Sequence, residues 1–244
     1  MMRTSFLLFL FLIFHTLSAQ EVISRNKQRT FFVGVHFSPD YSYRRLVNND
    51  GQSVSETIIR SRDRMEKARL GFTTGASVGW HLSSRLQFES GVFYSAKGYK
   101  TNKELLVYIP PVSPGDPVAV KHIYRKQFLD IPLRVVYLWG GKRLQVAPSG
   151  GVVFNLFMHQ GQLTYSYYES GEVKKTKTQL LDDIRKMNLS VQLGMGLRYR
   201  LNDRLKIVAE PVFRYGLLNS ADTPVAEKLW TTGLNAGMYF SFKK

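Results

Sequence analysis

The sequence feature that most constrains the fold is a period-two alternation of apolar and polar residues. Between Met187 and Leu201, every odd-numbered residue is apolar or aromatic, and every even-numbered residue is polar, charged or glycine. Successive side chains of a β-strand point to opposite faces, so this pattern predicts a strand with one apolar face and one polar face. The same alternation occurs in seven further segments: 31–38, 70–82, 86–97, 129–139, 144–156, 205–215 and 230–242.

The connections between these eight segments are alternately long and short. The short ones lie around Ser83-Ser84, Gly140-Gly141-Lys142 and Asn202-Asp203, and the long polar ones are centred on 40–69, 98–122, 159–185 and 217–228. Outer-membrane barrels combine short periplasmic turns with longer extracellular loops. The sequence therefore predicts an all-β fold, namely an eight-stranded antiparallel up-and-down transmembrane β-barrel with short periplasmic turns and four long extracellular loops.

A soluble β-sandwich or a lipocalin-like barrel would also show alternation. Two features favour the membrane barrel. The polar faces are rich in glycine, serine and threonine, which suit a narrow interior filled by side chains. Aromatic residues also lie near the strand ends on the apolar face, as in the girdles of membrane barrels: Trp80, Tyr94, Trp139, Tyr199, Tyr215, Trp230 and Phe242.

The first residues have the layout of a secretory signal peptide. Arg3 supplies a positive charge, Phe6–Phe14 is an unbroken apolar run, and Ala19 offers a small residue at the cleavage position. The apolar run is too short to span a membrane as a helix, which disfavours the alternative of an uncleaved anchor. We expect a signal peptide over 1–19, a periplasmic N-terminal segment over 20–29, and an outer-membrane β-barrel over 30–244.

The composition narrows the possible chemistry. The chain has no cysteine, which excludes disulfides, zinc–thiolate sites and cysteine nucleophiles. Its net charge of +16 bears on the surfaces and partners that the protein can contact, and it does not identify a fold. Because the basic residues are not interleaved with a base-stacking aromatic platform, we expect no nucleic-acid partner. We also expect no cofactor and no metal.

Six charged residues occupy polar-face positions and are predicted to point into the barrel: Glu89, Asp130, Arg134, Arg198, Glu210 and Arg214. Counted from the turns, Glu89 and Arg134 lie at similar depth on adjacent strands, and so do Arg198 and Glu210. Buried charges need partners, so these residues are predicted to form a structural ion-pair network. An eight-stranded barrel is only wide enough to be filled by side chains, and we expect no pore.

Basic residues gather near the short turns: Arg85, Lys142, Arg143, Arg200, Arg204 and Lys206, with Arg25, Lys27 and Arg29 before the first strand. The long connection at 40–69 carries a second group: Arg44, Arg45, Arg60, Arg62, Arg64, Lys67 and Arg69. Both groups are expected to pair with outer-membrane lipid phosphates. The sharper hypothesis is an acidic protein partner at the periplasmic rim.

An enzymatic alternative rests on His36-Phe37-Ser38, which places a histidine and a serine on one face of the first strand. A serine hydrolase needs a base within hydrogen-bond reach of the nucleophile and a third group that orients the base. Same-face spacing supplies neither, so we expect no catalytic residues. A lipid-modifying barrel enzyme remains the third functional hypothesis.

Three segments resemble the PorT-like outer-membrane barrels of the Bacteroidetes. LQFESGVFYSAKG (86–98) is similar to a "tGl.Ys.KG" strand, FLDIPLRVVY (128–137) to the following "yLeIPl..ky" strand, and EPVFRYGLLN (210–219) to the seventh strand with its Tyr-Gly turn-off. The resemblance implies a non-catalytic outer-membrane component of type IX secretion, which exports proteins bearing a C-terminal sorting domain. Other proteins of the secretion machinery would then be its partners. A general surface barrel with an adhesin-like or structural role is the alternative.

Overall fold

The computed structural model describes residues 31–108, 115–180 and 184–242, so the predicted signal peptide, the segment 20–29 and its basic residues lie outside the described residues. The described part of the chain forms one helix and eleven strands: β1 (Phe31–Asn48), α2 (Ser53–Met65), β2 (Glu66–His81), β3 (Leu86–Thr101), β4 (Glu104–Leu105), β5 (Ala119–Tyr137), β6 (Trp139–Gly140), β7 (Leu144–Tyr167), β8 (Val173–Gln179), β9 (Met187–Arg200), β10 (Leu205–Gly216) and β11 (Val225–Phe242). Among these residues, no helix has both the length and the apolar character needed to cross a membrane.

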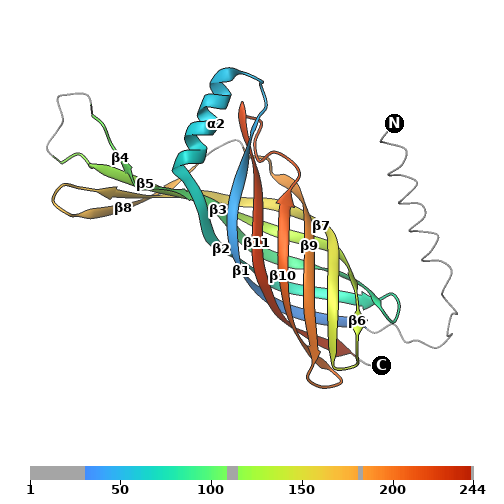
Figure 1. The fold of residues 1–244 in the computed structure, drawn as a ribbon. Helices are drawn as coiled ribbons and strands as arrows, with labels where there is room; N and C mark the ends of the chain where they lie inside the picture. Colours follow the sequence, from blue (N-terminus) through green and yellow to red (C-terminus); the bar gives the residue numbers. More distant parts are fainter. Residues whose placement is uncertain (1–30, 109–114, 181–183, 243–244) are drawn as a thin grey trace.

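Eight long strands form a closed ring (Figure 1). Each pairs antiparallel with two others, in the cyclic order β1, β2, β3, β5, β7, β9, β10, β11 and back to β1. At the point of closure, Phe31 of β1 lies opposite both Trp80 of β2 and Phe242 of β11. A closed ring leaves no long strand with an unpaired edge, so its backbone groups bond to one another. The predicted all-β antiparallel fold is confirmed, and β4, β6 and β8 are short additions that were not predicted.

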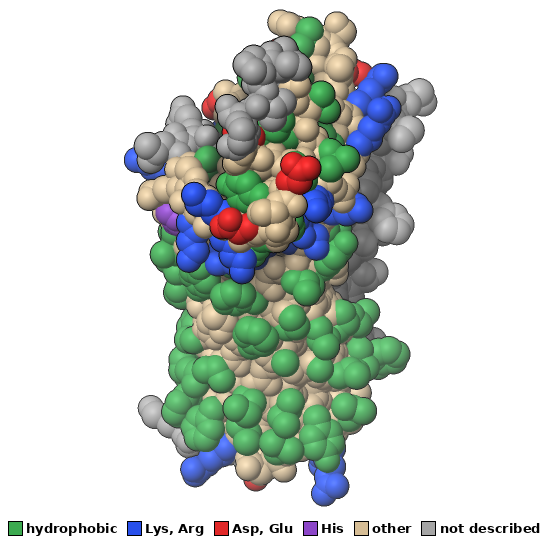
Figure 2. Space-filling view, turned by 90° about the vertical axis from the view of Figure 1, so that its left-hand side faces the viewer, with side chains coloured by type: hydrophobic (Ala, Val, Ile, Leu, Met, Phe, Trp, Pro, Cys, Tyr) green, Lys and Arg blue, Asp and Glu red, His purple; other side chains and the backbone are tan. Residues whose placement is uncertain are grey.

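The ring is apolar on its outer face and polar on its inner face, the reverse of a soluble protein. On β1, the outward residues Val35 and Phe37 are 57% and 53% exposed, whereas the intervening His36 and the next inward residue, Ser38, are buried. Figure 2 shows hydrophobic side chains covering the barrel wall, with Lys and Arg gathered above and below this band. A soluble sandwich would place the apolar face inside, so that alternative does not fit.

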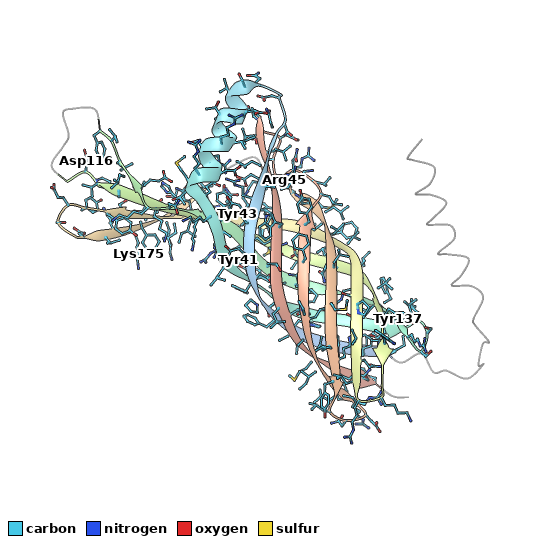
Figure 3. The ribbon with its side chains drawn as sticks, in the orientation of Figure 1. Tyr41, Tyr43, Arg45, Asp116, Tyr137 and Lys175 are labelled. Carbon is cyan, nitrogen blue, oxygen red and sulfur yellow. The ribbon has the colours of Figure 1, made fainter. Side chains whose placement is uncertain are left out.

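Aromatic side chains lie at both ends of the apolar wall. Tyr41 and Tyr43 lie near the end with the long connections, which we call the long-loop end, and Tyr137 lies at the opposite, short-turn end (Figure 3). The ring of Trp230 lies 6.4 Å from that of Tyr41 and 6.2 Å from that of Tyr43. At the short-turn end, Phe31 packs against Trp80 and Phe242. Such girdles are typical of both interfaces of a membrane.

Glycines of the inward face are required by close packing. A Cβ atom at Gly79 would lie 2.2 Å from the ring of Phe32, and one at Gly194 would lie 2.6 Å from a carboxylate oxygen of Glu210. Only glycine leaves these bulky side chains room inside so narrow a ring.

The strands extend further than the sequence predicted. β1 continues to Asn48 and β7 to Tyr167, while β5 begins at Ala119; the predicted connection at 40–69 contains the end of β1, all of α2 and the start of β2. Beyond the apolar band, both faces of a strand can be polar, so the period-two signal is weaker there. The predicted loops at 40–69 and 159–185 are therefore largely strand and helix in their described parts.

Four strand segments form a sheet that projects sideways from the long-loop end of the barrel (Figure 1). We call it the wing, and it consists of β4, residues 119–127 of β5, residues 159–167 of β7, and β8. The pairing of β5 with β7 shifts register between Gln127 and Phe128, where Met158 is the extra residue. A bulge increases the local twist and bends the strand, which explains why the wing turns away at this point.

Candidate functional site

The deepest charged cluster is centred on Glu89, which is 1% exposed. Arg134 Nε donates a hydrogen bond to Glu89 Oε2 at 2.9 Å, and Arg198 Nη2 donates to Glu89 Oε1 at 2.6 Å. Arg134 Nη1 also donates to Glu210 Oε2 at 2.7 Å, and the Tyr239 hydroxyl donates to Glu89 at 3.1 Å. Two carboxylates and two guanidiniums thus form a group with no net charge, contributed by β3, β5, β9 and β10.

Neutral side chains provide further hydrogen bonds to this cluster, although the buried Nε of Arg198 has no partner among the described residues. Ser149 Oγ donates to Glu210 Oε1 at 2.6 Å, and the Asn235 amide donates to Glu210 Oε2 at 3.3 Å. Gln87 accepts a hydrogen bond from Arg198. Buried charge is tolerated only where its hydrogen bonds are satisfied, which holds for both carboxylates.

The structure brings together four of the six predicted interior residues, namely Glu89, Arg134, Arg198 and Glu210. Glu89 and Arg134 lie directly opposite each other in the β3–β5 register. The ion pair of Arg198, however, crosses the interior to Glu89; its neighbour in register on β10 is the uncharged Val208.

Asp130 and Arg214 belong to separate pairs. Lys97 Nζ lies 2.8 Å from Asp130, and Arg214 Nη1 lies 3.5 Å from Asp40. Asp40 also accepts hydrogen bonds from the hydroxyls of Ser38 and Thr73. Asp40 lies in the predicted connection at 40–69, and Lys97 lies on the inward face of β3; neither was among the six predicted interior residues.

A separate charged cluster lies at the long-loop end and holds α2 against the barrel. Arg44 Nε donates to Glu66 at 2.8 Å, and Arg44 Nη1 donates to Asp63 of α2 at 2.5 Å. Arg62 of α2 bonds Glu66 and Glu227, each at 2.7 Å. Arg44 and Arg62 were predicted to pair with lipid phosphates, but both are paired within the protein.

Arg62 keeps its charge in this cluster. Burial by itself lowers the pKa of its guanidinium, but the hydrogen bond to Glu66 and the electrostatic interactions with the Tyr99 hydroxyl and the Glu227 carboxylate outweigh burial and raise the pKa above its ordinary value. Lys126 Nζ contacts the second oxygen of Glu227 at 2.5 Å, so that carboxylate joins β5, β11 and α2. We call the cluster formed by Arg44, Arg62, Asp63, Glu66 and Glu227 the latch.

Replacing Arg62 with alanine is expected to loosen α2, because it removes two of the three ion pairs that join α2 to the strands and leaves only the pair of Asp63 with Arg44. Hydrogen exchange of the amides of residues 53–65 should accelerate by about ten-fold or more, equivalent to ~1.4 kcal/mol. Arg60→Ala is the matched control, because Arg60 is 76% exposed and reaches only Glu56, at 3.6 Å. Equal exchange of α2 in the two variants would show that the latch does not hold the helix.

The histidine–serine pair suggested by the sequence does not form. His36 Nε2 lies 2.8 Å from Ser77 Oγ on β2, whereas Ser38 Oγ donates to Asp40 at 2.6 Å. His36, Ser38 and Ser77 are all buried inside the ring, away from the apolar wall that would meet lipid substrate. The hydrolase alternative built on His36 and Ser38 is therefore wrong in its pairing.

The interior offers little open space. The cavity between Thr73, Asp130, Arg134 and Arg214 has a volume of about 20 Å³, room for about one water molecule. Within residues 31–108, 115–180 and 184–242, no group of three or more His, Asp or Glu side chains is placed to hold a metal ion. The charged and polar side chains described above fill this part of the interior.

The predicted basic rim residues lie around the short-turn end. Arg85, Lys142, Arg143 and Arg204 are exposed, and Arg200 and Lys206 are half-buried and directly opposite each other in register. Arg85 Nη1 reaches the Tyr137 hydroxyl at 3.4 Å. Among the described residues, no ion pair joins any of these six to an acidic side chain.

Comparison with known proteins gives one family match and several similar structures. Neisserial surface protein A aligns with 14% identity and a TM-score of 0.45, covering 88% of this chain and 100% of that protein. A major outer membrane protein from Thermus thermophilus aligns with 13% identity and a TM-score of 0.44, covering 87% and 99%. The outer membrane protease OmpT from Escherichia coli aligns with 7% identity and a TM-score of 0.43, covering 89% and 99%. No curated protein sequence matches the chain. The family model described as "Outer membrane protein beta-barrel domain" matches residues 18–222.

Proposed function

Because the chain belongs to the outer membrane protein beta-barrel domain family, we propose that it is a non-catalytic outer-membrane component of protein secretion, acting as PorT does in type IX secretion. The observation that carries this proposal is the resemblance of 86–98, 128–137 and 210–219 to PorT-like strands, which correspond to β3, β5 and β10. A filled interior supports a role through surfaces, because a barrel without a channel acts by contacting other molecules.

The proposal includes an orientation. The eight ring strands cross the outer membrane, the short turns lie in the periplasm, and α2 and the wing lie outside the cell. Export by a signal peptide over 1–19 is part of this proposal. The basic short-turn rim then faces the periplasm, where an acidic surface of another secretion protein would complement it.

A general surface barrel is the second candidate. It is favoured by the wing and α2, which together extend well beyond the barrel at the long-loop end (Figure 1). Such projecting surfaces suit an adhesin-like or structural role.

Deletion of the gene in the source organism tests the proposal. Secreted proteases and adhesins with C-terminal sorting domains are expected to accumulate unprocessed in the periplasm, and a plasmid copy is expected to restore export. Unchanged export would refute the secretion role and leave the surface barrel as the better candidate.

The same strain tests the periplasmic rim. Complementation with Arg85→Glu/Arg204→Glu is expected to restore little export, because charge reversal repels an acidic partner. Lys174→Glu/Lys186→Glu reverses the same number of exposed charges at the opposite end and is the matched control. Full export by the rim variant, with normal membrane insertion, would exclude an acidic partner there.

A further inference from the structure

The outward face of the wing carries a basic groove where the wing leaves the barrel wall. The groove has a volume of about 400 Å³ and is formed by β5, β7 and β8. Its charged lining residues are Arg125 of β5 and Lys177 of β8, with His159 of β7 between these strands. The amide side chains of Gln127 and Gln179 also line it.

This groove borders the apolar wall. Arg125 and Gln127 occupy the same alternating face of β5 as Leu129 and Ile131, whose side chains belong to the outward wall. On β7, Met158, which is 56% exposed, directly precedes His159. The groove therefore lies just beyond the apolar band, at the level where lipid headgroups meet a membrane barrel.

The described strands that form the groove provide no acidic counterpart to its basic residues. β5, β7 and β8 together contain a single acidic residue, Asp130, which points inward and pairs with Lys97. Within the described part of the chain, neither Arg125 nor Lys177 forms an ion pair, in contrast to the latch arginines. Lys175 extends the positive charge along β8 (Figure 3).

A further guanidinium approaches from β2. Arg69 Nη1 donates to the backbone carbonyl of Lys97 at 3.4 Å, and the next residue, Gly98, lies opposite Arg125 in the β3–β5 register. Arg69 and Arg125 thus flank the same short stretch of β3 from its two sides. Arg69 therefore adds positive charge beside Arg125, on the β3 side of the groove, while Arg125 of β5 and Lys177 of β8 line the groove itself.

We propose that the groove binds the phosphorylated headgroup of a glycolipid whose acyl chains lie along the wall at Leu129 and Met158. A guanidinium group can donate two parallel hydrogen bonds to the oxygens of one phosphate, and the opposite charges strengthen these bonds. The amides of Gln127 and Gln179 line the same groove and suit sugar hydroxyls. Basic side chains spread over a flat interface would attract any anionic lipid, whereas this groove adds polar groups that favour a sugar. The inference goes beyond the secretion role and rests only on the outer-membrane location.

The test uses the full mature chain, purified in detergent micelles, with lipid binding measured by native mass spectrometry. The probes are bisphosphorylated lipid A, the same lipid A without phosphates, and phosphatidylglycerol. The variant Arg125→Gln/Lys177→Gln is expected to bind bisphosphorylated lipid A about ten-fold more weakly than the unsubstituted chain. Lys174→Gln/Lys186→Gln removes the same charge from exposed sites that do not line the groove and is expected to bind normally.

Each outcome decides the matter. If both variants weaken lipid A binding equally, the effect comes from overall charge, and the proposed site is wrong. If dephosphorylated lipid A binds as tightly as the phosphorylated form, the groove does not recognise the phosphate. If phosphatidylglycerol binds as tightly as phosphorylated lipid A, the groove does not recognise the sugar. Because the assay contains no secretion proteins, its result is independent of the deletion experiment.

Discussion

Replacing Glu89 with glutamine is expected to destabilise the barrel by about 3–5 kcal/mol, because removing one partner of a buried ion pair leaves the other charge uncompensated. Glutamine keeps the size of the side chain, so the loss reports charge. Both Arg134 and Arg198 bond Glu89, and only Glu210 would remain to balance them. Equilibrium unfolding in urea with the protein in lipid vesicles measures the effect.

The control for this experiment is Glu56→Gln. Glu56 is 59% exposed on α2 and makes a single loose contact with Arg60, so its loss is expected to change stability by less than ~0.5 kcal/mol. The double variant Glu89→Gln/Arg198→Gln restores charge balance and should be less destabilised than the sum of the two single variants. Additive effects would mean that the cluster is not a coupled unit.

Replacing Leu193 with arginine is expected to cost about 2–4 kcal/mol, because it places a charge on the lipid face at mid-depth. Leu193 is 61% exposed at the centre of β9. On a soluble protein, a leucine this exposed would accept arginine with little cost. The variant therefore distinguishes a wall that faces lipid from a wall that faces water.

Met187→Arg is the matched control for depth. Met187 lies on the same face of the same strand and is 57% exposed, but it is the first residue of β9, at the long-loop end. An arginine near the interface costs about 0–1 kcal/mol. Equal unfolding free energies for the two arginine variants in vesicles would contradict a lipid-facing wall.

The strand pattern was predictable because alternation is a local property. β9 and β3 match the predicted segments to within a few residues at one end, since each has a continuous apolar face. The facing pair of Glu89 and Arg134 could also be predicted, because β3 and β5 each meet a short turn at the same end of the barrel, and the two residues lie at similar depth when counted from those turns. Membership of an outer-membrane barrel family agrees with this pattern.

The partners of the interior charges were less predictable. The polar face of a strand identifies residues that point inward, but the closure of the ring decides which of them meet across the interior. Arg198 therefore bonds Glu89 from the far side of the barrel, and Arg214 bonds Asp40, which no local pattern had singled out. The latch was missed for the same reason, because Arg62 and Glu227 are far apart in the sequence.

The sequence by itself determined the strands, their two faces and the apolar wall, because these depend on residues a few positions apart. Only the tertiary structure decided how the ends of the barrel are built. The bulge at Met158 turns the wing sideways, and α2 is held by charges from β1, β2 and β11. Both depend on contacts between distant segments, whose geometry is set by the curvature and closure of the whole ring.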